Sequence, residues 1–176
     1  MKPTFKPTRS IQAVMEIILV LQDKNSARIT WESFQHPSNS FVQNMKLRSI
    51  INMGEKQLLT SWKSPSELSI RSFSLGISPS YLPELCMWNG SHLYWCSGPL
   101  NGQTFIGIPN MNSVFLYEFH LFNHQSDVYT TFSHEYASVL WYYILTPQGT
   151  LLEKIKDDSM EKWKVTWQNK KTECDV

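Results

Sequence analysis

An Asn-Gly pair between two aromatic segments constrains the fold of this 176-residue chain more than any other feature. It lies in the segment LCMWNGSHLYWCSGPLNG, residues 85–102, and Asn-Gly between apolar runs is the strongest short-range signal of a β-hairpin. With the turn at residues 90–92, Trp88 lies opposite Tyr94, and Cys86 lies opposite Cys96. Because side chains alternate along a strand, we expect all four on one face of the two-stranded ribbon.

The three cysteines allow more than one arrangement. Cys86 and Cys96 can form a cross-strand disulfide, because the expected register brings their Cβ atoms within bridging reach. They can also be two separately packed thiols, and a zinc site that includes His92 is the third, least favoured interpretation. An oxidising compartment favours the disulfide. Cys174 is then left over, which predicts a partner cysteine beyond the end of this chain.

The same hairpin contains the sequence Asn89-Gly90-Ser91, which is an acceptor for N-glycosylation. An acceptor of this kind has meaning only on a surface loop of a protein in the secretory pathway. Asn89 is therefore a predicted glycosylation site.

Alternating or short apolar runs predict strands along most of the chain. The expected strands are residues 17–22, 58–62, 73–77, 114–122, 128–132, 139–145, 151–156 and 163–167. Residues 139–145, VLWYYIL, are apolar on both faces, as expected for a central strand or one covered on both sides. Residues 42–51 fit a short helix or an irregular crossing, and Gly54-Glu55-Lys56 fits a turn. Short strands separated by turns predict an antiparallel sandwich, barrel or prism.

The tryptophans on the expected strands admit two interpretations. Sugars stack on exposed aromatic rings, whereas aromatic side chains also dominate the cores of β proteins. We favour the core, because the tryptophans concerned lie on apolar strand faces. They are Trp88, Trp95, Trp141, Trp163 and Trp167.

Charge and hydropathy exclude several kinds of partner. The formal net charge is +1, so nothing favours binding to nucleic acid or to anionic membranes. The apolar run at residues 13–21 contains Glu16 and is too short to span a bilayer. No small-residue cleavage site follows before Lys24, so we expect neither a convincing signal peptide nor a transmembrane segment in this chain.

Catalytic signatures are missing from the sequence. It contains no phosphate-binding Gly-rich loop, no HRD or DFG segment of a kinase, no GxSxG and no HExxH. His120 and His124 have the spacing of helical metal ligands, but they lie in a strand-like run, where four residues span about 13 Å. We therefore expect no catalytic residue, no cofactor and no metal site.

Three segments carry a resemblance to a known family. WNGSHLYWCSGPLNGQTFIGIPNM, residues 88–111, and TSWKSP, residues 60–65, resemble the S-locus glycoprotein domain of plant S-domain (G-type lectin) receptor-like kinases. WESFQHP, residues 31–37, resembles the tail of the bulb-type, mannose-binding lectin domain that precedes it. The chain departs from the usual family wording at Cys96, where Arg is common, and at Leu100, where Trp is common.

The resemblance implies an all-β fold, in which an antiparallel lectin-like β-prism or barrel follows a remnant of the bulb-type lectin domain. The implied domains are residues 1–53, the lectin remnant and a connector, and residues 54–176, the S-locus glycoprotein-like domain, which is cut at the start of an EGF-like module. The sugar-binding pattern of bulb lectins, Q-x-D-x-N-x-V-x-Y, does not occur in the sequence, so we do not expect sugar binding.

The resemblance also implies a function without catalysis, since the kinase domain of the family is absent. It implies an extracellular or plasma-membrane ectodomain that binds a protein or peptide ligand, as in recognition of pollen or related cell-surface signalling. A receptor ectodomain is a candidate dimer partner. Loops 97–113 and 122–128 are the default ligand contacts, because binding residues concentrate on loops. A soluble secreted decoy glycoprotein and a non-functional truncated gene product are the alternatives.

Overall fold

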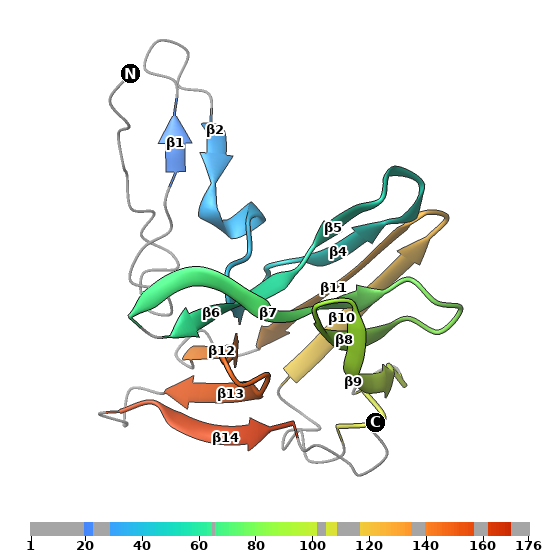
Figure 1. Ribbon diagram of the computed structural model, residues 1–176. Helices are drawn as coiled ribbons and strands as arrows, with labels where there is room; N and C mark the ends of the chain where they lie inside the picture. Colours follow the sequence, from blue (N-terminus) through green and yellow to red (C-terminus); the bar gives the residue numbers. More distant parts are fainter. Residues whose placement is uncertain are drawn as a thin grey trace.

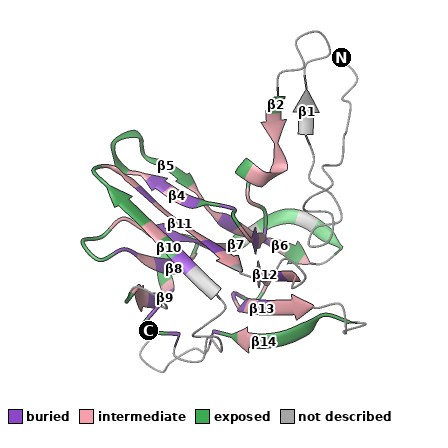
Figure 2. Ribbon diagram, turned by 180° about the vertical axis from the view of Figure 1, so that it is seen from behind, coloured by how far each residue is buried: buried purple, intermediate pink, exposed green. Residues whose placement is uncertain are grey.

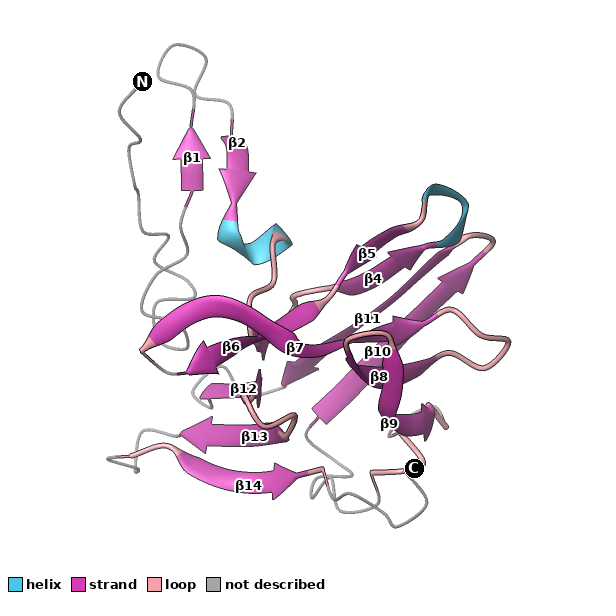
Figure 3. Cartoon of the chain, viewed as in Figure 1, coloured by secondary structure: helices cyan, strands magenta, loops and turns pink. Residues whose placement is uncertain are grey.

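The computed structural model describes residues 20–22, 29–64, 66–101, 105–108, 117–134, 140–156 and 162–169, and strands dominate throughout. Their bounds, with those of two short 3-10 turns, are β1 Val20–Gln22, β2 Ile29–Glu32, η1 Ser33–Gln35, β3 Ser40–Val42, β4 Leu47–Ile50, η2 Ile51–Met53, β5 Glu55–Gln57, β6 Leu59–Ser64, β7 Glu67–Ser78, β8 Glu84–Asn89, β9 His92–Pro99, β10 Tyr117–His124, β11 Asp127–His134, β12 Leu140–Leu145, β13 Leu151–Lys156 and β14 Lys164–Gln168. Figure 3 shows strands joined by short loops, which confirms the expected all-β class.

Three four-stranded antiparallel sheets form the body of the molecule (Figure 1). Sheet I has the order β6-β7-β8-β9, sheet II the order β10-β11-β4-β5, and sheet III the order β14-β13-β12-β3. The β1–β2 hairpin is hydrogen-bonded to none of them in the described part of the chain and stands apart from them in Figure 1. Three sheets around a common interior make a β-prism, which is one of the architectures that the strand and turn pattern allowed and that the resemblance implied.

The inward faces of the three sheets share one hydrophobic core. Figure 2 shows buried positions alternating with more exposed ones along β4 and β11, which is the period of two expected for a half-buried strand. The buried cluster comprises Phe41, Val42, Met45, Leu47, Leu59, Leu75, Leu85, Met87, Trp95, Phe105, Ile108, Phe119, Phe132, Trp141, Tyr143, Leu145 and Leu151. Because every sheet contributes to it, the sheets stabilise one another.

Strands from the first third of the chain complete two of the sheets. β3 pairs with β12, through Phe41 opposite Tyr143, and β4 pairs with β11, through Arg48 opposite Tyr129. The short helix expected over residues 42–51 is therefore wrong, and the irregular crossing is limited to residues 43–46, before β4. The apolar spacing there suited either structure, and pairing with distant strands selected the extended one.

The turn expected at Gly54-Glu55-Lys56 is only partly present. Gly54 has a left-handed φ of 67° and ends η2, but Glu55 and Lys56 already belong to β5. The expected short strand near residue 60 is present as β6.

The central hairpin has the expected cysteine pairing but a different register at its tip. Cys86 lies opposite Cys96, whereas Trp88 lies opposite Leu93 and not opposite Tyr94. The register shifts between the pairs formed by Met87 and Trp88, and the turn is shorter than expected. Gly90, with φ of 61°, occupies the first turn position, where a two-residue type II′ turn requires glycine.

The expected burial of the last strand is wrong at two positions. Trp163 and Val165 are 36% and 48% exposed, whereas Trp167 packs against the core. A register shift between Glu153 and Lys154 moves β14 relative to β13, so that Trp167 lies opposite Glu153 and Val165 opposite Lys154. Trp167 therefore faces the core with Glu153, and Val165 faces outward with Lys154.

β12 matches one of its two expected arrangements, the central strand, and not the other, the strand covered on both faces. Trp141, Tyr143 and Leu145 are buried, but the side chains on its other face are only half-buried. The strand is central in sheet III, yet the described part of the chain covers only one face fully.

Candidate functional site

The hairpin tip presents the predicted glycosylation acceptor to solvent. Asn89 ends β8 and is exposed, and Gly90 and Ser91 form the turn and are also exposed. The acceptor lies on the tip of sheet I, away from the core.

A disulfide closes the same hairpin nearer the body. Cys86 Sγ and Cys96 Sγ are 2.17 Å apart, and the two Cα atoms are separated by 4.2 Å. Cys86 is buried and Cys96 is half-buried. Along β8, Cys86 alternates with Leu85 and Met87, which belong to the hydrophobic cluster. Cys174 lies outside the described residues.

Removing this disulfide should lower stability without abolishing the fold. For the double variant Cys86→Ser/Cys96→Ser we expect a loss of about 2–3 kcal/mol in the free energy of unfolding, because the bridge closes a short loop. Urea denaturation followed by tryptophan fluorescence measures it. Cys174→Ser is the control, since it keeps the pair intact. Equal midpoints for oxidised wild type and the double variant would contradict the expectation.

The expected contact loop at residues 97–113 is anchored where the structure describes it. The Gly107 amide donates to the Ser97 carbonyl at 2.6 Å, and the Ser97 hydroxyl accepts a hydrogen bond from the Leu85 amide at 3.0 Å. Phe105 and Ile108 are buried in the core, whereas Ile106 is exposed. A Cβ on Gly107 would lie 2.5 Å from the Ser97 carbonyl oxygen, so only glycine fits this close approach.

The second expected contact loop, residues 122–128, belongs to a larger surface that we call the outer face of sheet II. Two rows of directly opposed residues cross its four strands. One row is Phe122, Tyr129, Arg48 and Gln57, and the next is His124, Asp127, Ile50 and Glu55. At the end of this sheet, the backbone joins the β10–β11 turn to η2, because the Ile51 amide donates to the Ser126 carbonyl at 2.8 Å.

Aromatic rings organise one half of this face. The Phe122 and Tyr129 rings stack with centroids 4.9 Å apart, and Lys46 Nζ lies 4.4 Å from the Tyr129 centroid. Phe122 is 44% exposed, so it offers apolar surface to a partner.

A bidentate ion pair fixes the centre of the face. Arg48 donates from Nε and a terminal guanidinium nitrogen to the two Asp127 carboxylate oxygens, both at 2.7 Å. These hydrogen bonds hold the pKa of Asp127 below its ordinary value and raise the pKa of Arg48, against the opposing effect of desolvation. The two side chains are thus held in one orientation.

This pair should make stability depend on pH in one direction. Because the pKa of Asp127 is depressed in the folded state, its contribution is present above the unfolded-state pKa, about 3.9, and is lost as pH falls through the folded-state value. We expect Asp127→Asn to cost about 1 kcal/mol or less at pH 7, since the pair is partly exposed. Urea titrations from pH 7 to acid should show that difference vanish. Arg48→Gln should remove the same pH dependence, and a constant difference across pH would contradict this account.

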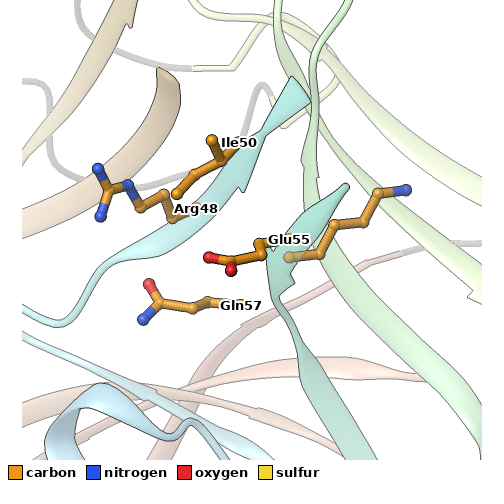
Figure 4. Close-up of a pocket in the computed structure, with 5 residues that line it drawn as sticks. Arg48, Ile50, Glu55 and Gln57 are labelled. Atoms are coloured by element: carbon orange, nitrogen blue, oxygen red, sulfur yellow. The ribbon is translucent and has the colours of Figure 1, made fainter. Parts of the chain in front are cut away.

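A surface pocket of about 370 Å³ lies beside the ion pair, between β4 and β5 (Figure 4). Its lining residues are Arg48, Ile50, Glu55, Lys56 and Gln57. Figure 4 shows the side chains of Arg48, Ile50, Glu55 and Gln57 on the same side of the two strands. The pocket combines an aliphatic wall with charged and amide groups.

Sequence patterns did not reveal this surface. Residues 48–57 and 122–129 are far apart in the chain, and only the pairing of β4 with β11 brings them together. Arg48 and Asp127 have no spacing signal of their own, because the sequence separation of an ion pair across a sheet is set by topology.

Within the part of the chain that the structure describes, the groups that could bind metal give no independent site. His120 and His124 both lie on β10, as expected for a strand, and His120 Nε2 is 3.3 Å from Ser133 Oγ. Glu84 has a carboxylate near the sulfurs of Cys86 and Cys96, but both sulfurs are used in the disulfide. Among the described residues, no helix is long and apolar enough to cross a membrane.

Comparison with known proteins finds two successive family matches. Residues 8–63 match the D-mannose binding lectin family, and residues 95–176 match the S-locus glycoprotein domain family. The lectin match includes β3 to β5, and the S-locus match includes β10 to β14, so sheets II and III combine strands from both matched segments.

Curated relatives from Arabidopsis thaliana support the same family. The G-type lectin S-receptor-like serine/threonine-protein kinase At1g11330 is 39% identical over 154 residues, which is 86% of this chain and 18% of the relative. The kinase SD1-13 of the same type is 35% identical over 163 residues, 91% of this chain and 19% of the relative. The chain thus spans about a fifth of the length of these relatives. It is therefore related to the G-type lectin S-receptor-like serine/threonine-protein kinases, through a mannose-binding lectin segment followed by an S-locus glycoprotein domain.

Proposed function

We propose that this chain is an extracellular recognition module of a receptor-like kinase or S-locus glycoprotein, which binds a protein or peptide ligand. The observation that carries the proposal is the succession of a lectin match and an S-locus glycoprotein match over one chain. Recognition of pollen, or a related cell-surface signal, is the process we propose. Binding would act by surface complementarity, with no bond made or broken by this chain.

The activity named for the relatives is that of a serine/threonine kinase. We propose that such activity belongs to another part of a longer receptor, because the two family matches of this chain are to the lectin and S-locus glycoprotein domains. Binding on this chain would then be read out by a kinase elsewhere. A second receptor ectodomain is the dimer partner that we propose.

The domain boundary expected from the sequence, between residues 53 and 54, is changed in this proposal. We propose that the recognition domain uses β3 to β14, so that it takes β3 to β5 from the segment matched by the lectin family. Pairing of β3 with β12 and of β4 with β11 supports this. Asn89 would carry a glycan, the disulfide would form during export, and Cys174 would pair with a cysteine beyond this chain.

Export behind a supplied signal peptide from plant cells tests the proposal. Intact-mass analysis should find one N-glycan that enzymatic deglycosylation removes, together with the mass of a bridged Cys86–Cys96 pair. Asn89→Gln should be exported without a glycan. A chain retained in the cell would overturn the extracellular assignment.

Ligand binding needs a separate measurement. The exported chain, immobilised, should retain a protease-sensitive component of cell-wall fluid, which is then identified, synthesised and titrated against the chain. Fluid pretreated with protease is the control. Failure to retain any peptide or protein that binds again in purified form would overturn the proposal of a protein or peptide ligand.

A further inference from the structure

The free edge of sheet II is an unused set of backbone hydrogen-bonding groups. In the order β10-β11-β4-β5, β4 has neighbours on both sides, whereas β5 is paired with β4 alone in the part of the chain that the structure describes. An edge strand of this kind can accept a further strand through its outward N–H and C=O groups. The side chain of Gln57 marks one end of the edge, where Nε2 donates to the Gln35 carbonyl at 3.1 Å.

Apolar side chains flank the other end of the edge. Ile51 and Met53, in the turn before β5, are 48% and 71% exposed. Ile50 forms the aliphatic wall of the adjoining pocket of about 370 Å³. A partner strand along β5 would therefore contact the apolar side chains of Ile50, Ile51 and Met53 near one end of the edge.

Among the charged side chains that line the pocket, the carboxylate of Glu55 is available to pair with a ligand. The Arg48 guanidinium is engaged by both oxygens of Asp127. Lys56 Nζ lies 5.7 Å from the Trp88 ring, on β8 of sheet I, so this cation is directed to another sheet. Glu55 is exposed and forms no hydrogen bond or salt bridge with the described residues, although it lies near enough to favour the charged form of Arg48.

We propose that β5 is the docking edge for an extended peptide that places a lysine or arginine side chain in the pocket against Glu55. The peptide would add a strand to sheet II, its cation would pair with the Glu55 carboxylate, and its aliphatic stem would lie along Ile50. A peptide fits better than a sugar because only a peptide backbone can use the row of N–H and C=O groups. The inference rests on the proposed function, whose ligand surface it identifies.

Matched peptides test the charge. The probes are an acetylated, amidated pentapeptide of alternating threonine and valine with a central arginine, and the same peptide with citrulline, which keeps the shape and loses the charge. Titrated against the full chain by amide NMR shifts, the arginine peptide should bind about fivefold more tightly, which corresponds to about 1 kcal/mol for a partly exposed ion pair. The shifts should concentrate on residues 50–57.

Variants test the partner residue. Glu55→Gln should reduce binding of the arginine peptide to the level of the citrulline peptide and leave the citrulline peptide unaffected. Glu67→Gln, on β7 of sheet I, removes the same charge from another exposed position and should change neither affinity. Equal affinities for the two peptides, or an effect of Glu67→Gln as large as that of Glu55→Gln, would overturn the proposal.

A third peptide tests whether the peptide backbone forms hydrogen bonds with β5. N-methylation of alternate amides in the arginine peptide removes its donors without changing its charge, and it should abolish binding if the peptide adds as a strand. Unchanged affinity would exclude strand addition.

The two proposals can fail separately. In one outcome, the chain retains a natural ligand, Glu55→Gln does not reduce that retention, and the synthetic peptides do not bind. That outcome would overturn the proposal for the β5 edge and support the recognition function. In the other outcome, the exported chain retains no natural ligand but binds the arginine peptide more tightly than the citrulline peptide. That outcome would support the β5 edge and overturn the recognition function.

Discussion

Replacing Phe132 with alanine should lower the free energy of unfolding by about 3–5 kcal/mol, the range for a buried phenylalanine. Its ring is fully buried on β11 of sheet II. It lies 4.5 Å from the Trp141 ring and 4.8 Å from the Phe41 ring, both of sheet III, measured between centroids. The cavity would open where two sheets meet, and backbone pairing within each sheet prevents the sheets from closing it fully.

Urea denaturation followed by fluorescence and far-ultraviolet circular dichroism measures this loss. Phe122→Ala is the matched control, because Phe122 lies on the adjacent strand and is 44% exposed on the outer face. We expect a loss of roughly 1 kcal/mol or less for it, as for most surface substitutions. Similar losses for the two variants would show that the core described for sheets II and III is wrong.

Deleting residues 1–53 should abolish cooperative folding, whereas deleting residues 1–37 should not. The longer deletion removes β3 and β4, so sheet III loses an edge strand and sheet II loses the strand between β11 and β5. It also removes the core side chains Phe41, Val42, Met45 and Leu47. Burial of four such side chains contributes about 6–12 kcal/mol, which is comparable to the whole stability of a domain.

The shorter deletion keeps β3 to β14. It removes the β1–β2 hairpin, which stands apart from the three sheets in Figure 1. Among the described residues of this segment, only the half-buried Phe34 packs against the core. Thermal melting by circular dichroism and the dispersion of amide NMR signals distinguish the two products. A cooperative melt of the 54–176 fragment would contradict our assignment of β3 and β4 to the recognition domain.

Local patterns in the sequence were sufficient where each strand meets its neighbour in the chain. The Asn89-Gly90 turn signal and the opposed cysteines predicted the hairpin of β8 and β9, because a tight turn fixes the pairing of the two strands that it joins. Alternation over residues 73–77 predicted a strand for the same local reason. Segments 88–111 and 31–37 also carried the family resemblance.

Where the pairing of two strands shifts by one residue, alternation in the sequence does not predict which residues lie opposite each other after the shift. The shift in β8–β9 pairs Trp88 with Leu93, and the shift in β13–β14 turns Trp163 and Val165 outward. A bulge adds one residue to one strand, and a period-two pattern has no means to show where that residue lies. Every side chain beyond it changes face.

The sequence by itself determined that this chain is built from antiparallel strands, because turn residues and apolar alternation act over a few neighbouring positions. The tertiary structure alone decided that β3 and β4 join strands more than seventy residues away, and therefore that Arg48 meets Asp127 beside Glu55. The physical reason is that the apolar faces of three sheets are buried only together. The outer face of sheet II, with its pocket and its free edge, follows from that assembly.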